Sequence, residues 1–220
     1  MAAGRGSTIN RTRLISAVAV AALLVAMGFS THFESGSDLT LRDQGAQKEL
    51  SSLAFAEEYY DPIIVPYIQE NAVDLKEIHD AILVDPDEAG ATYGNRDGDS
   101  SAYSVPTVVE AKAVSYQNDL MLLEVDGVEL EGAVYLAAGP ALNGTAIRDV
   151  TGLVRFGMFV NQLGYQDAGT KLNDKVRDNV LAQFDPITDL EGKTLRIVGA
   201  FSLFNTRNYI IMPISIEVLD

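Results

Sequence analysis

Residues 192–199, GKTLRIVG, decide the fold of this chain. Leu195 and Ile197 alternate with polar or smaller neighbours, and a Gly-Lys turn precedes them, which is typical of a strand with one buried face. The run continues as AFSLF over 200–204 and is followed by the polar turn 205–208. A second β-rich run, YIIMPISIEVL, occupies 209–219. We therefore expect a pair of strands at the end of the chain.

Three more β-rich runs lie upstream, at 104–117, 119–127 and 128–139. The Asp126-Gly127 pair between the last two runs predicts a tight hairpin. A helix is expected over 168–184, because its apolar residues recur at helical spacing on one stripe: Leu172, Val176, Val180 and Leu181. Five strands with a helix before the fourth predict a closed antiparallel barrel of the oligonucleotide/oligosaccharide-binding (OB) type, with the helix covering one end. A β-sandwich is the competing architecture.

The preceding region has a helical pattern. Leu53 lies on a predicted apolar helix face, Pro62 and Pro66 predict a kink or break, and Asp74 is a good N-cap for a following helix whose apolar face includes Leu83. The chain is therefore expected to be α+β. We divide it into a helical region at 46–102 and an OB-like barrel with an inserted helix at 103–220.

The N-terminal part predicts the compartment. Residues 14–33 carry no formal charge, and the basic flank 1–13 holds Arg5, Arg11 and Arg13, whereas all 31 acidic residues of the chain come later. A basic flank stays in the cytoplasm, so the chain beyond the uncharged segment is exported. The segment is long enough for a transmembrane signal anchor, with 34–45 as a linker. A cleaved signal peptide with its cut near 28–30 is the alternative, and would give a secreted form.

Composition excludes several function classes. The chain has no Cys, two His and a net charge of −15. Disulfides and thiolate metal sites are excluded, and an acidic chain is unsuited to nucleic acid. We expect no cofactor, no metal site and no catalytic activity. His79 is expected on a helix surface. The loop 95–99, NRDGD, has oxygen ligands at alternate positions but lacks the glutamate of a calcium loop, which favours a solvated loop.

Four polar residues are the candidate contacts for a ligand or partner: Arg148, Asp149, Asn161 and Gln162. An arginine–carboxylate pair in a cleft positions hydroxyls or anions. The alternative is a buried hydrogen-bond network that holds the inserted segment on the barrel, in which Arg148 pairs with Asp149.

Several motifs, in order, resemble domain-of-unknown-function family 2291, described as predicted periplasmic lipoproteins. They are DPIIVPYIQENAVDL at 61–75, DPDEAGATYGNR at 85–96, GTAIRD at 144–149, FVNQLGY at 159–165, LND at 172–174, LEGKTLRIVGAFSL at 190–203 and MPISIEV at 212–218. The resemblance implies a helical part and a β-barrel, and frequent genomic association with sugar ABC transporters, with no established activity. One departure is that no lipobox Cys is present, and Phe29 stands where one is expected.

These observations favour a bacterial single-pass membrane protein whose C-terminal domain works outside the cytoplasm. It is expected to be an accessory or binding protein, with components of an ABC transporter as the partners that the resemblance implies. A stand-alone carbohydrate-binding barrel is the alternative, and a hydrolase that uses paired carboxylates is less favoured.

Overall fold

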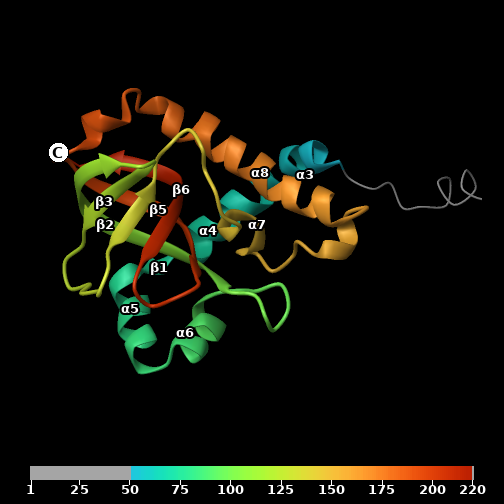
Figure 1. Cartoon of the computed structure of the whole chain (residues 1–220), viewed down its shortest axis with the longest axis horizontal. Coiled ribbons are helices and arrows are strands. Elements are labelled where there is room, and N and C mark those ends of the chain that lie inside the picture. The colour runs from blue at the N-terminus through green and yellow to red at the C-terminus, as the bar shows by residue number, and fades with distance from the viewer. Residues whose placement is uncertain (1–50, 220) are drawn as a thin grey trace, which may run out of the picture. The chain divides into compact units, whose positions relative to one another are not determined.

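A closed five-stranded barrel forms the centre of the molecule. In the computed structural model, which describes residues 51–219, its strands are β2 (Tyr103–Gln117), β3 (Leu120–Glu124), β4 (Val134–Ala137), β5 (Thr194–Leu203) and β6 (Tyr209–Val218). They pair in the order β2-β3-β4-β6-β5, and a β2–β5 pairing closes the barrel (Figure 1). The short strand β1 (Val73–Asp74) adds to β2 in parallel.

The sheet is mixed, so the expectation of a purely antiparallel barrel was wrong. Strand β4 runs parallel to β6, whereas β2–β3, β3–β4, β2–β5 and β5–β6 are antiparallel. The long connection after β4 brings β5 back beside β2, and the hairpin to β6 then places β6 beside β4 in the same direction. This strand order and the helix before β5 are those of an OB-type barrel.

The tight hairpin of the barrel lies at a different turn from the one predicted. Asn118 and Asp119 have φ of 51° and 66°, which is the backbone of a two-residue hairpin turn between β2 and β3. The Asp126-Gly127 pair instead lies in the longer connection 125–133, because β3 ends at Glu124 and β4 begins at Val134. A two-residue loop of Asn-Asp provides the same geometry without glycine.

The helix α5 (Leu75–Val84) covers one opening of the barrel. Asp74 caps it as predicted, with its carboxylate accepting a hydrogen bond from the Lys76 amide at 2.9 Å. The barrel interior and this helix share one apolar core, whose fully buried members include Leu75, Ile78, Ile82, Met121, Leu136, Ile197, Phe201, Tyr209 and Ile211. Leu83, expected on the buried face, is exposed.

His79 lies inside this core, so its expected place on a helix surface was wrong. It is 2% exposed, and its Nδ1 lies 3.0 Å from the Tyr209 hydroxyl. The two polar groups satisfy each other at the barrel opening, which explains how an imidazole is accommodated among apolar neighbours.

A second core lies on the outer wall of β5 and β6. The outward side chains of these strands, Val198, Ala200, Met212 and Ile214, are covered by helices: α3 (Ser52–Tyr59), α4 (Val65–Asn71), α7 (Ala146–Asp149) and α8 (Gln162–Asn179). Figure 1 shows α8 running along the barrel towards α3. Gly199 allows a close strand crossing here, because a Cβ at this position would lie 2.2 Å from the Met212 carbonyl oxygen.

The inserted helix begins and ends earlier than predicted. It spans Gln162–Asn179, and the residues after it form the 3₁₀ segments Leu181–Gln183 and Ile187–Leu190. Its buried side chains belong to the core on the outer wall, whereas Leu190 belongs to the core inside the barrel. This helix therefore covers the wall of the barrel rather than one of its ends.

The proline pair interrupts α-helical bonding as predicted. A π-helical segment, Tyr60–Ile64, contains Pro62, and α4 follows with Pro66 in its first turn. Both prolines lack the amide that an α-helix interior needs; the wider turn contains Pro62, and Pro66 lies in the first turn of α4, where a missing amide is tolerated. A further helix, α6 (Pro86–Tyr93), leads into the loop before β2.

The predicted basic flank, anchor and linker at 1–45 lie outside the described residues. Among the helices of residues 51–219, none combines the length and the apolar character that a membrane crossing requires.

Candidate functional site

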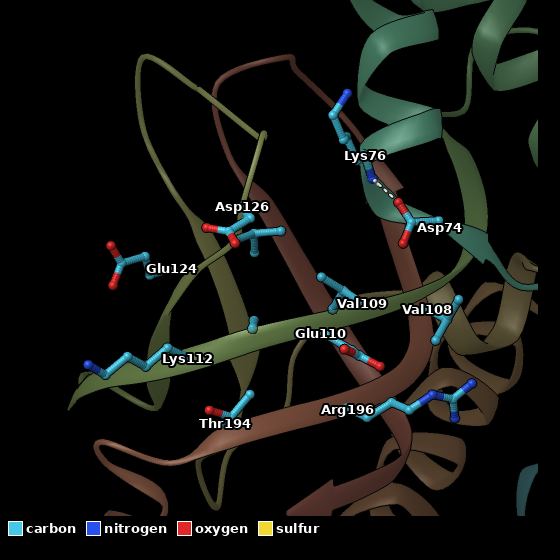
Figure 2. Close-up of a pocket in the computed structure, with 12 residues that line it drawn as sticks. Asp74, Lys76, Val108, Val109, Glu110, Lys112, Glu124, Asp126, Thr194 and Arg196 are labelled. Atoms are coloured by element: carbon cyan, nitrogen blue, oxygen red, sulfur yellow. Dashed lines mark hydrogen bonds between the residues drawn. The ribbon is translucent and has the colours of Figure 1, made fainter. Parts of the chain in front are cut away.

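A polar groove of about 750 Å³ runs across the outer face of β2 and β5. Figure 2 shows its charged side chains arriving from separate parts of the chain. They are Asp74 and Lys76 at the start of α5, Glu110 and Lys112 on β2, Glu124 at the end of β3, Asp126 in the connection after β3, and Arg196 on β5, with the uncharged Thr194 beside them. A volume of this size is within the usual range for ligand pockets.

Strand register places opposite charges side by side in the groove. Glu110 is the register partner of Arg196, and Lys112 is the register partner of both Glu124 and Thr194. These residues occupy alternate positions of their strands, so they share the outer face while Val109 and Ala111 point into the core. The barrel wall therefore carries a row of mixed charges.

Two of the three cations on this face, Lys112 and Arg196, form no ion pair within the described residues. Within residues 51–219, neither Lys112 nor Arg196 has a carboxylate oxygen within 4.0 Å. Lys76 pairs with Asp80 at 2.6 Å on the exposed surface of α5. An exposed cation that is not held by its own chain gains most from an incoming carboxylate.

The loop after β3 forms the far side of the groove. Gly127 has φ of 73°, and a Cβ at this position would lie 2.7 Å from the Lys76 side chain. Glycine thus allows the loop to pass directly over the start of α5, which brings Asp126 towards the strands (Figure 2). The groove depends on this local backbone shape.

The predicted pair Arg148 and Asp149 forms a buried network rather than part of the groove. Nε and Nη2 of Arg148 donate to the two Asp149 carboxylate oxygens at 2.7 and 3.0 Å, and both residues are 7% exposed. Nη1 donates to the Tyr165 carbonyl at 3.3 Å, and the guanidinium lies 3.8 Å from the centre of the Tyr165 ring. This is the bidentate geometry of a strong ion pair.

Tyr165 extends the network to the loop at 95–99. Its hydroxyl donates to Asp97 at 2.6 Å and lies 3.5 Å from Asp149. Burial, followed by the hydrogen bond to Asp97, raises the pKa of the Tyr165 phenol, so this group stays protonated at neutral pH. The Asn95 amide donates to the Tyr67 hydroxyl and the Val150 carbonyl.

The loop at 95–99 is therefore engaged in protein contacts. Arg96 lies over the Tyr103 ring, 4.3 Å from its centre, and faces Asp87 and Asp99 at 3.5 and 3.7 Å. In the described part of the chain, no group of three or more His, Asp or Glu side chains is arranged to hold a metal ion.

The other two predicted residues lie apart from the Arg148 pair. Asn161 is the N-cap of α8, and its side chain accepts a hydrogen bond from the Gly164 amide at 3.0 Å. Gln162 is exposed in the first turn of the same helix. The structure thus gives Asn161 a local role and does not join all four residues in one cleft. Sequence reasoning missed the groove, although the alternation of Glu110 and Lys112 with buried neighbours was visible in the β2 run.

A smaller hollow of about 210 Å³ lies beside the loop between β5 and β6. It combines apolar side chains with three side-chain amides: Phe204, Ile210 and Met212 with Asn143, Asn205 and Asn208. Phe204 is 74% exposed. In OB-type barrels, the loop between the fourth and fifth strands is one of the segments that bind ligands.

Comparison with a solved structure supports the fold. The structure resembles the crystal structure of an OB-fold protein from Thermotoga maritima with a TM-score of 0.62 at 17% sequence identity. The match covers 78% of this chain and 99% of that one. At this identity the likeness concerns the fold alone. No curated protein matches the sequence.

The family comparison covers most of the sequence. The model of domain-of-unknown-function family 2291, described as a predicted periplasmic lipoprotein, matches residues 19–217. This range includes the barrel up to the last residue but one of β6, the helices on its wall and the groove. The description of the family as periplasmic also agrees with a location outside the cytoplasm. The chain belongs to domain-of-unknown-function family 2291, the predicted periplasmic lipoproteins.

Proposed function

We propose that this protein is a non-catalytic accessory protein, tethered to the membrane, whose barrel binds a partner outside the cytoplasm. The observation that carries the proposal is the groove on β2 and β5, where Lys112 and Arg196 have no carboxylate oxygen within 4.0 Å among residues 51–219. Complementary charge on a partner protein speeds its encounter and selects it against other proteins.

The composition of the groove favours a protein partner over a sugar. Its twelve lining residues include four carboxylates and three cations but no aromatic ring. Sugar rings are commonly bound by stacking on aromatic faces, whereas extended polypeptides offer charges of both signs. The partner that the family resemblance suggests is a subunit of a sugar ABC transporter.

The tether is proposed to be the uncharged segment 14–33. The family description implies a lipid anchor, but the 220 residues contain no Cys, the residue to which the lipid is attached in such proteins. Twenty residues without charge are long enough to cross a bilayer core of about 30 Å. A transmembrane segment can therefore replace the lipid and hold the barrel at the same surface.

Crosslinking in native membranes, followed by purification and mass spectrometry, tests the proposal. We expect transporter subunits to co-purify with the wild-type chain and to be lost with Arg196→Glu, because reversed charge repels the partner's carboxylates. Arg207→Glu is the matched control, since Arg207 is also exposed but lies outside the groove, beside Glu131 at 3.2 Å. Equal recovery with both variants would contradict a role for the groove.

The hollow beside Phe204 supports the second candidate, a carbohydrate-binding barrel. An exposed aromatic face next to side-chain amides suits a sugar, because the ring stacks and the amides bond to hydroxyls. Titration with a panel of monosaccharides, followed by NMR, tests this function. It predicts shifts at 204–208 that Phe204→Ala abolishes, and unchanged spectra would exclude it for the sugars used.

A further inference from the structure

Large apolar side chains are exposed on two neighbouring segments of the described structure. The segment between α7 and the first turn of α8 exposes Leu153, Phe156, Val160 and Leu163, with exposures from 47% for Phe156 to 73% for Leu163. Leu53 of α3 adds a fifth at 58%, although its sequence pattern placed it on a buried face. We call these five residues the apolar tip.

Contacts between neighbouring residues hold the elements of the apolar tip together. The Ser52 hydroxyl, next to Leu53, bonds to the Asp167 carboxylate in α8. Phe159 packs edge-on against Phe55 of α3, with ring centres 5.3 Å apart. Figure 1 shows α3, the start of α8 and the loop before it at the end of the described structure away from the β2–β3 hairpin.

The main segment of the apolar tip lacks acidic residues, unlike the chain as a whole. Residues 150–166 contain a single charged residue, Arg155, and no Asp or Glu, although the whole chain carries 31 acidic residues. Arg155 is exposed. An acidic protein is repelled from an anionic lipid surface, but this segment presents apolar side chains and a cation instead.

The chain enters the described structure at the same end. Ser51, the N-cap of α3, is its first described residue and directly precedes the apolar tip. Residues 34–50 connect it to the uncharged segment 14–33. Seventeen residues span at most about 60 Å when fully extended. A bilayer that holds 14–33 is therefore within reach of the tip.

We propose that the apolar tip inserts into the lipid surface of the membrane in which the chain is anchored. This inference rests on the membrane tether of the proposed function. Phe156 and the aliphatic side chains enter the boundary between headgroups and acyl chains, and Arg155 contacts lipid phosphates. One transmembrane segment and one inserted tip hold the barrel at two points, which orients its groove relative to the membrane.

The absence of Trp from the chain allows a direct test, because any introduced Trp is the sole indole reporter. The full chain is reconstituted into vesicles of phosphatidylcholine and phosphatidylglycerol with or without brominated acyl chains. Phe156→Trp reports on the tip, Val160→Trp repeats the measurement at a second tip position, and Phe204→Trp is the exposed control on the β5–β6 loop. Flotation of the vesicles in high salt reports separately on the tether.

We expect brominated lipid to quench the two tip variants several-fold more than the control, and acrylamide to quench them several-fold less. A chain that floats with the vesicles but shows equal quenching at all three positions would overturn the insertion of the apolar tip and leave the tether intact. Protection from acrylamide without quenching by brominated lipid would show that the apolar tip contacts protein rather than lipid, and would overturn its insertion into the membrane. A chain that does not float would overturn both the tether and the tip.

Discussion

The Arg148–Asp149 pair shows how burial converts two charges into a structural element. The guanidinium makes two hydrogen bonds to the carboxylate, a third to the Tyr165 carbonyl and a stacking contact with the ring. Since both side chains are almost fully buried, neither charge has water to replace a lost partner. The pair therefore locks α7 onto α8, and through Tyr165 onto Asp97.

Arg148→Ala is predicted to lower the free energy of unfolding by about 3–5 kcal/mol, because Asp149 is left buried without its partner. Urea unfolding measures this change. The double variant Arg148→Ala/Asp149→Ala should recover part of the loss, since it removes both charges. Arg155→Ala is the exposed control and should leave stability within about 0.5 kcal/mol of wild type. Normal unfolding of Arg148→Ala with loss of the membrane partner would instead mark Arg148 as a binding residue.

Tyr209 is predicted to make stability depend on alkaline pH. Burial raises its pKa to about 12 in the folded state, against about 10 in an unfolded chain. The folded state keeps the proton to a higher pH than the unfolded state does. The stability that Tyr209 contributes is therefore complete below pH 10 and is lost as pH rises towards 12. The loss amounts to about 2–3 kcal/mol.

Tyr209→Phe isolates this effect from the other tyrosines. The variant removes the hydrogen bond to His79 and leaves this buried ring nitrogen unpaired, which costs about 1–3 kcal/mol at neutral pH. Its free energy of unfolding, measured in urea at pH 8 and at pH 11, should fall by less between the two values than that of wild type. Parallel declines in the two proteins would show that Tyr209 does not titrate as its burial implies.

The strand β5 joins the two cores, since its inward side chains fill the barrel and its outward ones meet the helices. Ile197 is fully buried inside, while Arg196 at the next position is exposed in the groove. Ile197→Asp is predicted to unfold the barrel, because an unpaired buried carboxylate costs several kcal/mol, comparable with the stability of a domain. A melting curve checks this. Arg196→Asp is the matched control and should melt near the wild-type temperature.

Elements with strong local signals were predictable from the sequence. The alternation of Leu195 and Ile197 gave the inward face of β5 correctly, and Asp74 caps α5, because both features depend on neighbouring residues only. The expectation of a single buried face was wrong beyond Ile197, since the wall helices also bury Val198 and Ala200. The parallel pairing of β4 with β6 was not predictable, since it arises from how a long connection returns β5 to β2. The burial of His79 likewise depends on Tyr209, which lies far away in sequence.

The candidate site was predicted only in part, because it too depends on contacts between residues that are far apart in sequence. The pairing of Arg148 with Asp149 was one of two alternatives open at the sequence level, and adjacency made it visible. The groove needs the register of β2 against β3 and β5, which places Lys112 beside Glu124 and Glu110 beside Arg196. Neither register can be inferred from a single segment of the sequence, because each depends on how two strands pair.

At the scale of the whole molecule, we predict that the mature protein keeps residues 14–33. The protein should stay with the membrane fraction after a high-salt wash, because an apolar segment in lipid is insensitive to ionic strength. Intact mass measurement of the purified protein provides the control for processing. A soluble form whose N-terminus begins near Phe29 or Thr31 would show that the segment is a cleaved signal peptide.

Photocrosslinking in cells is the sharpest test of whether the groove binds a partner at the membrane. A photoreactive amino acid is placed at Lys112 in the groove or, as control, at Arg207 outside it. We expect one discrete adduct with a membrane protein from position 112 that depends on illumination, and none from position 207. No adduct from position 112, or the same adducts from both positions, would refute binding by the groove.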